Sequence, residues 1–197
     1  MKVIIIKYNA GNVQSVQFAL QRLGIQAIVS DNHTEIEQAD KVIFPGVGNA
    51  FAAMESLKEK QLDQLIPRLT QPVLGICVGM QLMCKHSEEN NTKGLGIMDL
   101  QVKKFVSDQA ELKIPQVGWN TITNLSTSLF TGINEESFVY YVHSYYVESG
   151  NETIALTDYT LPYSAAVKKD NFYGVQFHAE KSAEIGELIL DNFLKLK

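Results

Sequence analysis

The first third of the chain alternates short apolar runs with segments of helical spacing. Val3 to Ile6 is a run of β-branched residues, and residues 12–23 then place apolar side chains at helical intervals before Gly24. The alternation continues with apolar runs at 25–29, 40–44 and 73–76 and helical segments at 50–57 and 62–69. Because strands that alternate with helices form a parallel sheet covered on both faces, the sequence predicts an α/β fold.

The pattern changes beyond about Gly94, where strand-like runs follow one another without helices between them. These runs cover residues 100–105, 119–123, 138–146, 154–157 and 164–168. Asp170-Asn171 marks a tight turn, and residues 182–196 place their apolar side chains on one helical face. We therefore expect one domain spanning residues 1–197, with a central, largely parallel sheet, flanking helices and additional antiparallel strands in the C-terminal half.

Composition and charge exclude several classes of protein. The chain is 45% apolar and 20% charged, which is enough apolar content for a sizeable core, and its net charge of −5 argues against a nucleic-acid or anionic-membrane partner. No apolar run approaches the length of a membrane span. Cys77 and Cys84 lie seven residues apart, a spacing that fits neither a disulfide framework nor a zinc site. We expect a cytoplasmic protein with free thiols and no metal or cofactor.

Cys77 lies in the sequence Gly75-Ile76-Cys77-Val78-Gly79, where an apolar run ends and a helix-forming segment begins. This context is typical of a nucleophile elbow, a strained strand-to-helix turn that carries a reactive side chain. We expect the two glycines to clear space beside the sulfur, and the helix N-terminus to favour the thiolate. An inert buried cysteine is the alternative from this motif alone, and it is the interpretation that we favour for Cys84.

A thiol nucleophile needs a histidine partner, and His178 is the best placed of the four histidines. It ends the strand-like run 172–178, and Glu180 follows two residues later, on the same side if the chain stays extended. Glu180 could then orient the imidazole toward Cys77. A surface histidine beside a helix-terminal charge is the alternative. His143 could be a site wall or an edge-strand side chain, whereas His33, in a turn, and His86 are expected to be solvated.

Pro45-Gly46-Val47-Gly48 directly follows the apolar run 41–44. Glycines at the carboxyl end of a parallel strand allow the backbone to approach a ligand and to aim N–H groups at it, as an oxyanion hole requires. A turn that is glycine-rich for steric reasons is the alternative.

In this order and at these separations, the three segments resemble the class I, triad-type glutamine amidotransferase family. The resemblance covers nearly the whole chain, and its strongest elements are PGVGNAF (45–51), LGICVGMQL (74–82), KGLG (93–96), IPQVGWN (114–120), YYVHSYY (140–146) and GVQFHAEKS (174–182). The chain looks most similar to members that pass ammonia to a (β/α)8-barrel cyclase of histidine biosynthesis. It differs from the usual family pattern at Lys7-Tyr8-Asn9, Gln116 and Ala179.

The resemblance implies a role for each matching residue. Cys77 would be the nucleophile, His178 the acid and base, and Glu180 the residue that orients it. Val78 and the Val47-Gly48 segment would supply the N–H groups of the oxyanion hole. The positions implied to hold glutamine are Gly46, Gln81, Glu89, His143, Ser144 and Tyr145. Those implied to face the cyclase are Gly11, Asn12, Pro115, Gln116, Trp119, Asn120 and Lys181.

The expected activity is the hydrolysis of glutamine to glutamate and ammonia, with the ammonia delivered to the cyclase for use on a phosphoribulosyl-formimino ribonucleotide. No metal or organic cofactor is needed for this chemistry. A glutaminase of another pathway is the first alternative. A peptidase with a cysteine elbow, and a redox-sensing or chaperone-like domain with an oxidisable cysteine, are the others.

Overall fold

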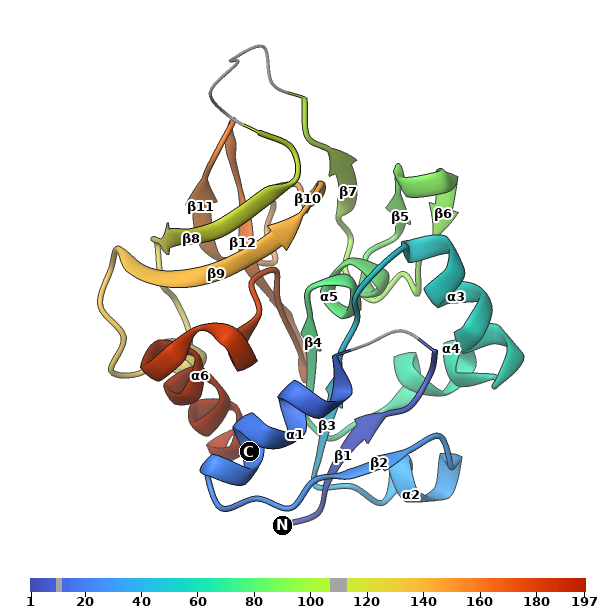
Figure 1. Cartoon of the computed structure of the whole chain (residues 1–197). Coiled ribbons are helices and arrows are strands. Elements are labelled where there is room, and N and C mark those ends of the chain that lie inside the picture. Colours follow the sequence, from blue (N-terminus) through green and yellow to red (C-terminus); the bar gives the residue numbers. More distant parts are fainter. Residues whose placement is uncertain (10–11, 107–112) are drawn as a thin grey trace.

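The computed structural model describes residues 1–9, 12–106 and 113–197, and these are built around one large sheet (Figure 1). The sheet has 11 strands in the order β2-β1-β3-β4-β13-β12-β10-β7-β5-β6, with β11 paired to β12, while β8 and β9 form a separate two-stranded sheet. The strands are β1 Val3–Ile6, β2 Ile28–Ser30, β3 Lys41–Phe44, β4 Val73–Ile76, β5 His86–Ser87, β6 Thr92–Lys93, β7 Gln101–Lys104, β8 Gln116–Ile122, β9 Ser137–His143, β10 Tyr145–Val147, β11 Thr153–Asp158, β12 Pro162–Lys169 and β13 Phe172–Val175.

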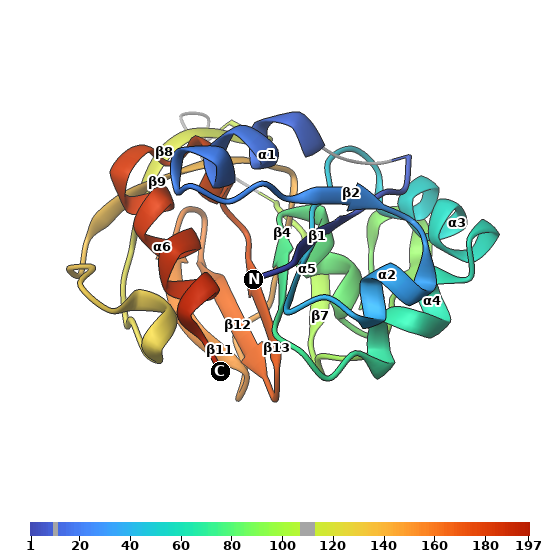
Figure 2. The same cartoon turned by 90° about the horizontal axis from the view of Figure 1, so that it is seen from below.

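The N-terminal half of the sheet is parallel, as the sequence predicted. β2, β1, β3, β4 and β13 pair in parallel, and β1, β3, β4 and β13 are buried along their whole length. The helices are α1 Val13–Arg22, α2 His33–Glu37, α3 Ala50–Glu59, α4 Leu62–Leu65, α5 Val78–Met83 and α6 Ala183–Lys195. α1 and α6 lie on one side of the sheet, and α3, α4 and α5 lie on the other (Figure 2). Burial from both sides explains why these strands read as unbroken apolar runs.

The antiparallel strands expected in the C-terminal half are present. β12 pairs antiparallel with β13, β11 and β10, and β10 pairs antiparallel with β7. The run 138–146, predicted as one strand, is divided at Ser144 into β9 and β10, which belong to different sheets. The division places His143, Ser144 and Tyr145 where the two sheets meet, so the chain changes direction at residues that were expected to hold substrate.

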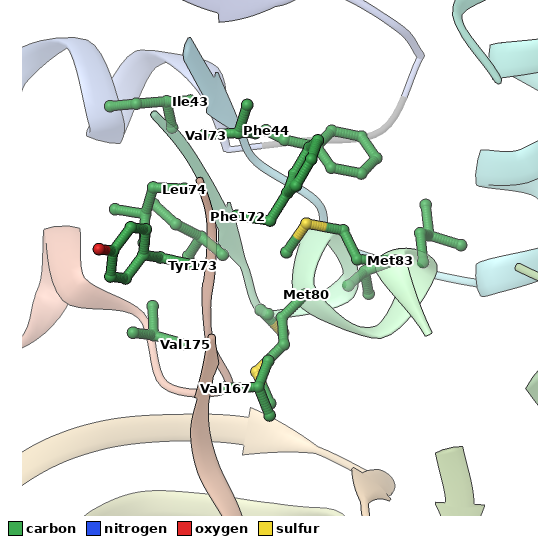
Figure 3. Close-up of a cluster of buried hydrophobic side chains, with 14 of the residues drawn as sticks. Ile43, Phe44, Val73, Leu74, Met80, Met83, Val167, Phe172, Tyr173 and Val175 are labelled. Atoms are coloured by element: carbon green, nitrogen blue, oxygen red, sulfur yellow. The ribbon is translucent and has the colours of Figure 1, made fainter. Parts of the chain in front are cut away.

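The core beneath the site is formed by strands β3, β4 and β13 and by helix α5 (Figure 3). Met80 and Met83 of α5 lie on the same face of the sheet as Phe44 and Phe172, all of them buried, whereas Leu74 and Val175 point to the opposite face. Burial of side chains of this size contributes about 1.5–3 kcal/mol each to folding. The short helix α5, which starts directly after Cys77, is therefore held by packing rather than by its own length.

Several local predictions need correction. α2 was not predicted, and His33 begins this helix rather than lying in a turn, because the Asn32 side chain caps it by accepting from the Glu35 N–H. His33 is half-buried, with Nε2 2.8 Å from the Lys60 carbonyl, so it is not a freely solvated side chain. The helix predicted at 62–69 ends at Leu65, and Pro67 lies in a 3-10 turn, η1 Ile66–Arg68. The other 3-10 turns are η2 Glu89–Asn91, η3 Ser128–Phe130 and η4 Ala179–Lys181.

No helix in the described ranges combines the length and apolarity that a bilayer crossing needs.

Candidate active site

Cys77 occupies a strained turn between β4 and α5. Its backbone has φ 52° and ψ −110°, a conformation that costs a residue with a side chain about 1–3 kcal/mol. Two backbone hydrogen bonds hold it, from Cys77 N–H to the Val175 carbonyl at 2.8 Å and from Gln81 N–H to the Cys77 carbonyl at 3.1 Å. The prediction of an elbow at Cys77 agrees with this geometry.

The glycines on either side of Cys77 have a different purpose from the one expected. A Cβ atom on Gly79 would lie 1.9 Å from the Phe44 carbonyl oxygen, and one on Gly75 would lie 2.5 Å from the Met83 methyl carbon. Both collisions involve the packing of α5 against the strands rather than the sulfur. The glycines therefore allow α5 to approach the carboxyl ends of β3 and β4, which is what fixes the position of Cys77.

His178 and Glu180 lie next to Cys77 in the buried interior. His178 Nδ1 is 2.8 Å from Glu180 Oε1, and both side chains are almost fully buried. The chain does not stay extended between them, because η4 begins at Ala179 and turns the carboxylate back under the ring. Burial lowers the pKa of His178, but hydrogen bonds with the side chains of Cys77 and Glu180 outweigh it and raise the pKa to about 10. The imidazole is thus protonated at neutral pH and ready to donate.

Asn12, expected at the partner side, contacts Glu180. Its Nδ2 donates to Glu180 Oε1 at 3.3 Å, and its own Oδ1 accepts from Ser15 Oγ at 2.6 Å. Glu180 Oε2 is buried and has no hydrogen-bond partner among the described residues. The start of α1 therefore helps to hold the carboxylate that orients His178. Gly11, also expected at the partner side, lies outside the described residues.

The segment Pro45-Gly46-Val47-Gly48 lies against the elbow. The Val78 N–H, expected in the oxyanion hole, donates to the Gly46 carbonyl at 3.3 Å, and the Tyr8 hydroxyl donates to the Pro45 carbonyl at 2.5 Å. Burial, together with the charge of Cys77, raises the pKa of Tyr8, so its hydroxyl stays a donor. In this arrangement one of the two expected oxyanion donors is occupied by the chain itself.

A cavity of about 330 Å³ opens above Cys77, a volume at the lower end of those usual for small-molecule sites. It is lined by Val47, Gly48, Cys77, Val78, Gln81, Glu89, Pro115, Val142, His143, Ser144, Tyr145, His178 and Lys181. It brings together every residue expected to form the oxyanion hole or to hold glutamine except Gly46, which packs against Val78 and Gly79. Pro115 and Lys181, expected to face a partner, also line it, so the cavity lies next to the expected partner side.

Gln81 and Glu89 shape the polar wall of the cavity. Gln81 Nε2 donates to the Tyr145 carbonyl at 2.8 Å and to Gln176 Oε1 at 3.0 Å. Both of its N–H groups are thus used, and Gln81 offers the cavity only its carbonyl oxygen. Glu89 Oε2 accepts from the Ala50 N–H at 2.6 Å, which anchors this carboxylate at the start of α3. An acceptor oxygen and a carboxylate are suited to a substrate ammonium group.

His143 is a neutral structural histidine in the cavity wall. Its Nδ1 lies 2.8 Å from the Tyr145 carbonyl, and its Nε2 lies 3.1 Å from Gln116 Oε1 and 3.2 Å from the Tyr163 hydroxyl. Burial lowers the pKa of His143 to about 4, although the hydrogen bond to Tyr145 opposes this effect. The two site histidines thus have opposite protonation preferences, which favours His178 over His143 as the candidate for proton transfer.

The residues expected to face a partner divide into an inward and an outward set. Gln116 is turned inward, 3% exposed and bonded to His143 and Tyr163, so its side chain is not part of the surface, and its place at the partner interface stays a prediction. Trp119 is 52% exposed, and Asn120 is half-buried with Nδ2 donating to the Asp158 carbonyl.

Trp119 belongs to an apolar outer face of the β8–β9 sheet. This outer face consists of Val117, Trp119, Phe138 and Val142, all of them exposed. In the strand register Val117 pairs with Val142, and Val142 also lines the cavity. The outer face therefore extends directly to the rim of the cavity.

Three residues that the structure places at the site had no role predicted from the sequence. Tyr8 lies under the loop, Val142 lines the cavity, and Gln176 Nε2 is 3.8 Å from Cys77 Sγ. Gln176 could have been found, because it lies in the GVQFHAEKS segment two residues before His178. The contacts of Tyr8 and Val142 depend on how distant strands are paired, which the local sequence does not contain.

Comparison with known proteins supports the assignment of the family and the fold. The family model described as glutamine amidotransferase class-I matches residues 4–196. Curated relatives named imidazole glycerol phosphate synthase subunit HisH include those of Bacteroides fragilis, 56% identical, Bacteroides thetaiotaomicron, 55% identical, and Blochmanniella floridana, 46% identical, each covering 100% of both chains. The chain belongs to the class I glutamine amidotransferase family, as its motifs indicated.

Solved structures agree at the level of the fold. A structure from Thermoplasma acidophilum, described as a putative GMP synthase component, has a TM-score of 0.75 at 21% identity, covering 98% of this chain and 92% of that chain. Another, described as a glutamine amidotransferase, has a TM-score of 0.75 at 16% identity, covering 98% and 97%. At these identities the likeness concerns the single-domain α/β architecture alone.

Proposed function

We propose that this chain, as one amidotransferase domain over residues 1–197, is the glutaminase subunit of an imidazole glycerol phosphate synthase. The observation that carries the proposal is the meeting of Cys77, on its strained elbow, with a protonated His178 oriented by Glu180 at 2.8 Å. The names of its relatives, which are 56% identical or less and of matching length, indicate this synthase rather than another amidotransferase. The cytoplasmic location expected from the sequence stays a prediction.

In the proposed reaction, the Cys77 thiolate attacks the carboxamide carbon of glutamine, and a C–S bond forms while the carbonyl oxygen gains a negative charge. His178 then gives its proton to the nitrogen as the C–N bond breaks, and ammonia leaves. A water molecule, deprotonated by His178, attacks the thioester; the C–S bond breaks and glutamate is released, with the Cys77 thiolate and the protonated His178 restored. The Gln81 carbonyl oxygen and Glu89 would hold the ammonium group of the substrate, and the Ser144-Tyr145 backbone would hold its carboxylate.

Cys77→Ala tests the nucleophile directly in the complex with a barrel cyclase. Loss of a catalytic triad's nucleophile lowers kcat by roughly a million-fold in the best-studied case, so glutamine-dependent synthesis should disappear. Synthesis from added ammonium salts should continue, because that reaction takes place on the partner. Glutamate release by the Cys77→Ala variant at a rate near that of wild type would disprove the proposal. Wild-type hydrolysis of peptides in preference to glutamine would favour a peptidase.

The proposed partner, a (β/α)8-barrel cyclase, docks on the apolar outer face of Val117, Trp119, Phe138 and Val142. The support is that this outer face is exposed, is aromatic at its centre and continues into the rim of the cavity from which ammonia must leave. Pairing of the chain with cyclases or synthases of other pathways, with glutamate release as the readout, distinguishes this partner from the alternatives.

Trp119→Ala measures the contribution of the outer face to docking. Truncation of a central interface tryptophan typically costs about 2 kcal/mol or more, which corresponds to roughly thirty-fold weaker binding of the cyclase. Ile28→Ala is the matched control, because Ile28 is also an exposed apolar side chain but lies on the opposite edge strand β2. Equal affinities of the two variants, measured by calorimetry, would remove Trp119 from the interface.

A further inference from the structure

Gln176 is a fully buried amide that lies beside the nucleophile. Its Nε2 is 3.8 Å from Cys77 Sγ, within hydrogen-bond range for sulfur, and the residue is 0% exposed. The sheet register explains the contact, because Ile76 of β4 pairs with Val175 of β13 in a parallel arrangement. The next residue on each strand, Cys77 and Gln176, therefore leaves the sheet side by side. A buried amide is retained in an interior only when its polar atoms have partners.

The orientation of the Gln176 amide follows from its hydrogen bond with Gln81, which is itself bonded to the Tyr145 carbonyl. The Tyr145 carbonyl can only accept, so the Gln81 atom 2.8 Å away must be its nitrogen. The same nitrogen lies 3.0 Å from Gln176, whose facing atom must then be its oxygen. The remaining amide atom of Gln176, directed at Cys77 Sγ, is consequently the N–H donor. No other orientation satisfies all three contacts.

We infer that Gln176 stabilises the Cys77 thiolate by donating a hydrogen bond to the sulfur, and that Gln81 orients it. The inference rests on the proposed role of Cys77 as the nucleophile. An N–H donor contributes about twice as much to an anion as to a neutral acceptor, so Gln176 favours the thiolate over the thiol. Gln81 also offers its carbonyl oxygen to the cavity, so one residue touches both the substrate position and the amide behind the nucleophile.

The linked contacts couple substrate binding to the reactivity of the sulfur. When an ammonium group is bound at the Gln81 carbonyl oxygen, it polarises the Gln81 amide and makes its N–H groups stronger donors. The Gln81 N–H then draws more strongly on Gln176 Oε1, and the Gln176 N–H becomes a stronger donor to Cys77 in turn. A small ligand that has an amino group but leaves the sulfur uncovered should therefore raise the reactivity of Cys77, whereas one that lacks this group should not. Glutamine itself should instead protect Cys77 from alkylation, because its carboxamide covers the sulfur.

The test measures the thiolate rather than glutamine turnover. Gln176→Leu removes the donor, and Gln176→Glu keeps the size of the side chain but places a carboxylate oxygen beside the sulfur. In both variants we expect the alkylation of Cys77 by iodoacetamide at neutral pH to be about ten-fold slower, equivalent to about 1.4 kcal/mol, with the larger effect in Gln176→Glu. The ultraviolet absorbance of the thiolate should fall in parallel, and mass spectrometry of the Cys77 peptide gives the rates.

Asn192→Leu is the matched control. Asn192 is also a buried amide, but it donates to the Leu129 and Thr131 carbonyls and lies outside the cavity lining. Its loss should lower the free energy of unfolding and leave the alkylation rate of Cys77 unchanged.

One further variant and one ligand keep the inference open to refutation. Gln81→Leu leaves Gln176 in place without its orienting donor, so it serves if the Gln176 variants do not fold, and it should slow alkylation several-fold. Any folded Gln176 or Gln81 variant that is alkylated at the wild-type rate would overturn the role of Gln176. Failure of glutamine to protect wild-type Cys77 from alkylation would instead count against Cys77 as the nucleophile, which separates the two proposals.

Discussion

The two halves of the candidate site differ in how completely the chain itself builds them. On the elbow side, Cys77 and His178 are 3% exposed and each is fixed by hydrogen bonds from neighbouring strands. On the loop side, Val47 is 36% exposed, and the Val78 N–H is bound to the Gly46 carbonyl rather than open to a substrate oxygen. For the proposed reaction, the nucleophile is thus complete in the isolated chain, whereas the oxyanion hole is not.

This difference has a simple geometric basis. The Gly46 carbonyl that accepts from the Val78 N–H belongs to the same peptide group as the Val47 N–H. Rotation of this peptide would therefore free the Val78 N–H and also turn the Val47 N–H toward the cavity. Gly46 is packed so tightly that a Cβ atom would lie 2.6 Å from the Gly79 nitrogen, and Gly48, with φ +89°, permits an unusual turn after it. The loop and the outer face of β8–β9 both border the cavity, so a docked partner can select the rotated form.

The largest effect expected from this difference between the two halves is therefore activation by the partner. Each missing oxyanion donor lowers kcat by about 100- to 1000-fold, and the isolated chain should be slower than the complex by at least this factor. The alkylation of Cys77 by iodoacetamide does not need an oxyanion hole, so the partner should change it far less. Glutaminase rates and alkylation rates measured with and without the cyclase check the comparison. An isolated chain that hydrolyses glutamine as fast as the complex would show that both halves are already built.

A smaller effect is expected from Gly79→Ala, which disturbs the elbow half. The added Cβ would have to displace α5 from the Phe44 carbonyl, and a shift of the nucleophile by about 1 Å costs roughly a hundred-fold in rate. Unlike the free chain, this variant should not be rescued by the partner. Gly24→Ala is the control, because a Cβ there meets nothing within 4 Å and only the φ of +78° is unfavourable. Kinetics in the complex together with thermal unfolding separate loss of position from loss of stability.

The same contrast explains what could be predicted from the sequence. The elbow, the parallel strands and the pairing of Cys77 with His178 follow from short motifs whose residues are neighbours in the chain or end adjacent strands. The inward turn of Gln116 and the contact of Asn12 with Glu180 were missed, because each depends on packing between segments that are far apart in sequence. The purpose of Gly75 and Gly79 was misjudged for the same reason, since the atoms that require them belong to Met83 and Phe44.

Glu180→Gln tests how strongly Glu180 raises the pKa of His178. We expect kcat to fall by about ten-fold at neutral pH. The variant loses one of the groups that raise the pKa of His178, so the alkaline limb of the kcat profile should move to lower pH. A histidine with a raised folded-state pKa stabilises the fold fully below about pH 6.5, and that contribution is lost as the pH rises through about 10. The difference in the free energy of unfolding between wild type and variant should therefore be largest near pH 6 and shrink toward pH 10. Denaturant titrations across this pH range check the prediction. A difference in the free energy of unfolding that stays constant with pH would contradict it.

The smallest effect is expected from a variant of Cys84. This variant tests whether the reactivity of Cys77 comes from the elbow or from burial near α5, which both cysteines share. Cys84 follows α5 directly and is as buried as Cys77, but its sulfur faces the Met80 carbonyl at 3.7 Å, and burial raises the pKa of its thiol. It lies outside the cavity and away from His178. Cys84→Ala should leave kcat unchanged and cost about 1 kcal/mol in stability, since a single small apolar group is removed. Native protein should take up one iodoacetamide adduct, at Cys77, and a second only after unfolding. Two adducts on the native protein would mean that the interior around α5 opens readily, and the rigidity ascribed to the elbow half would have to be abandoned.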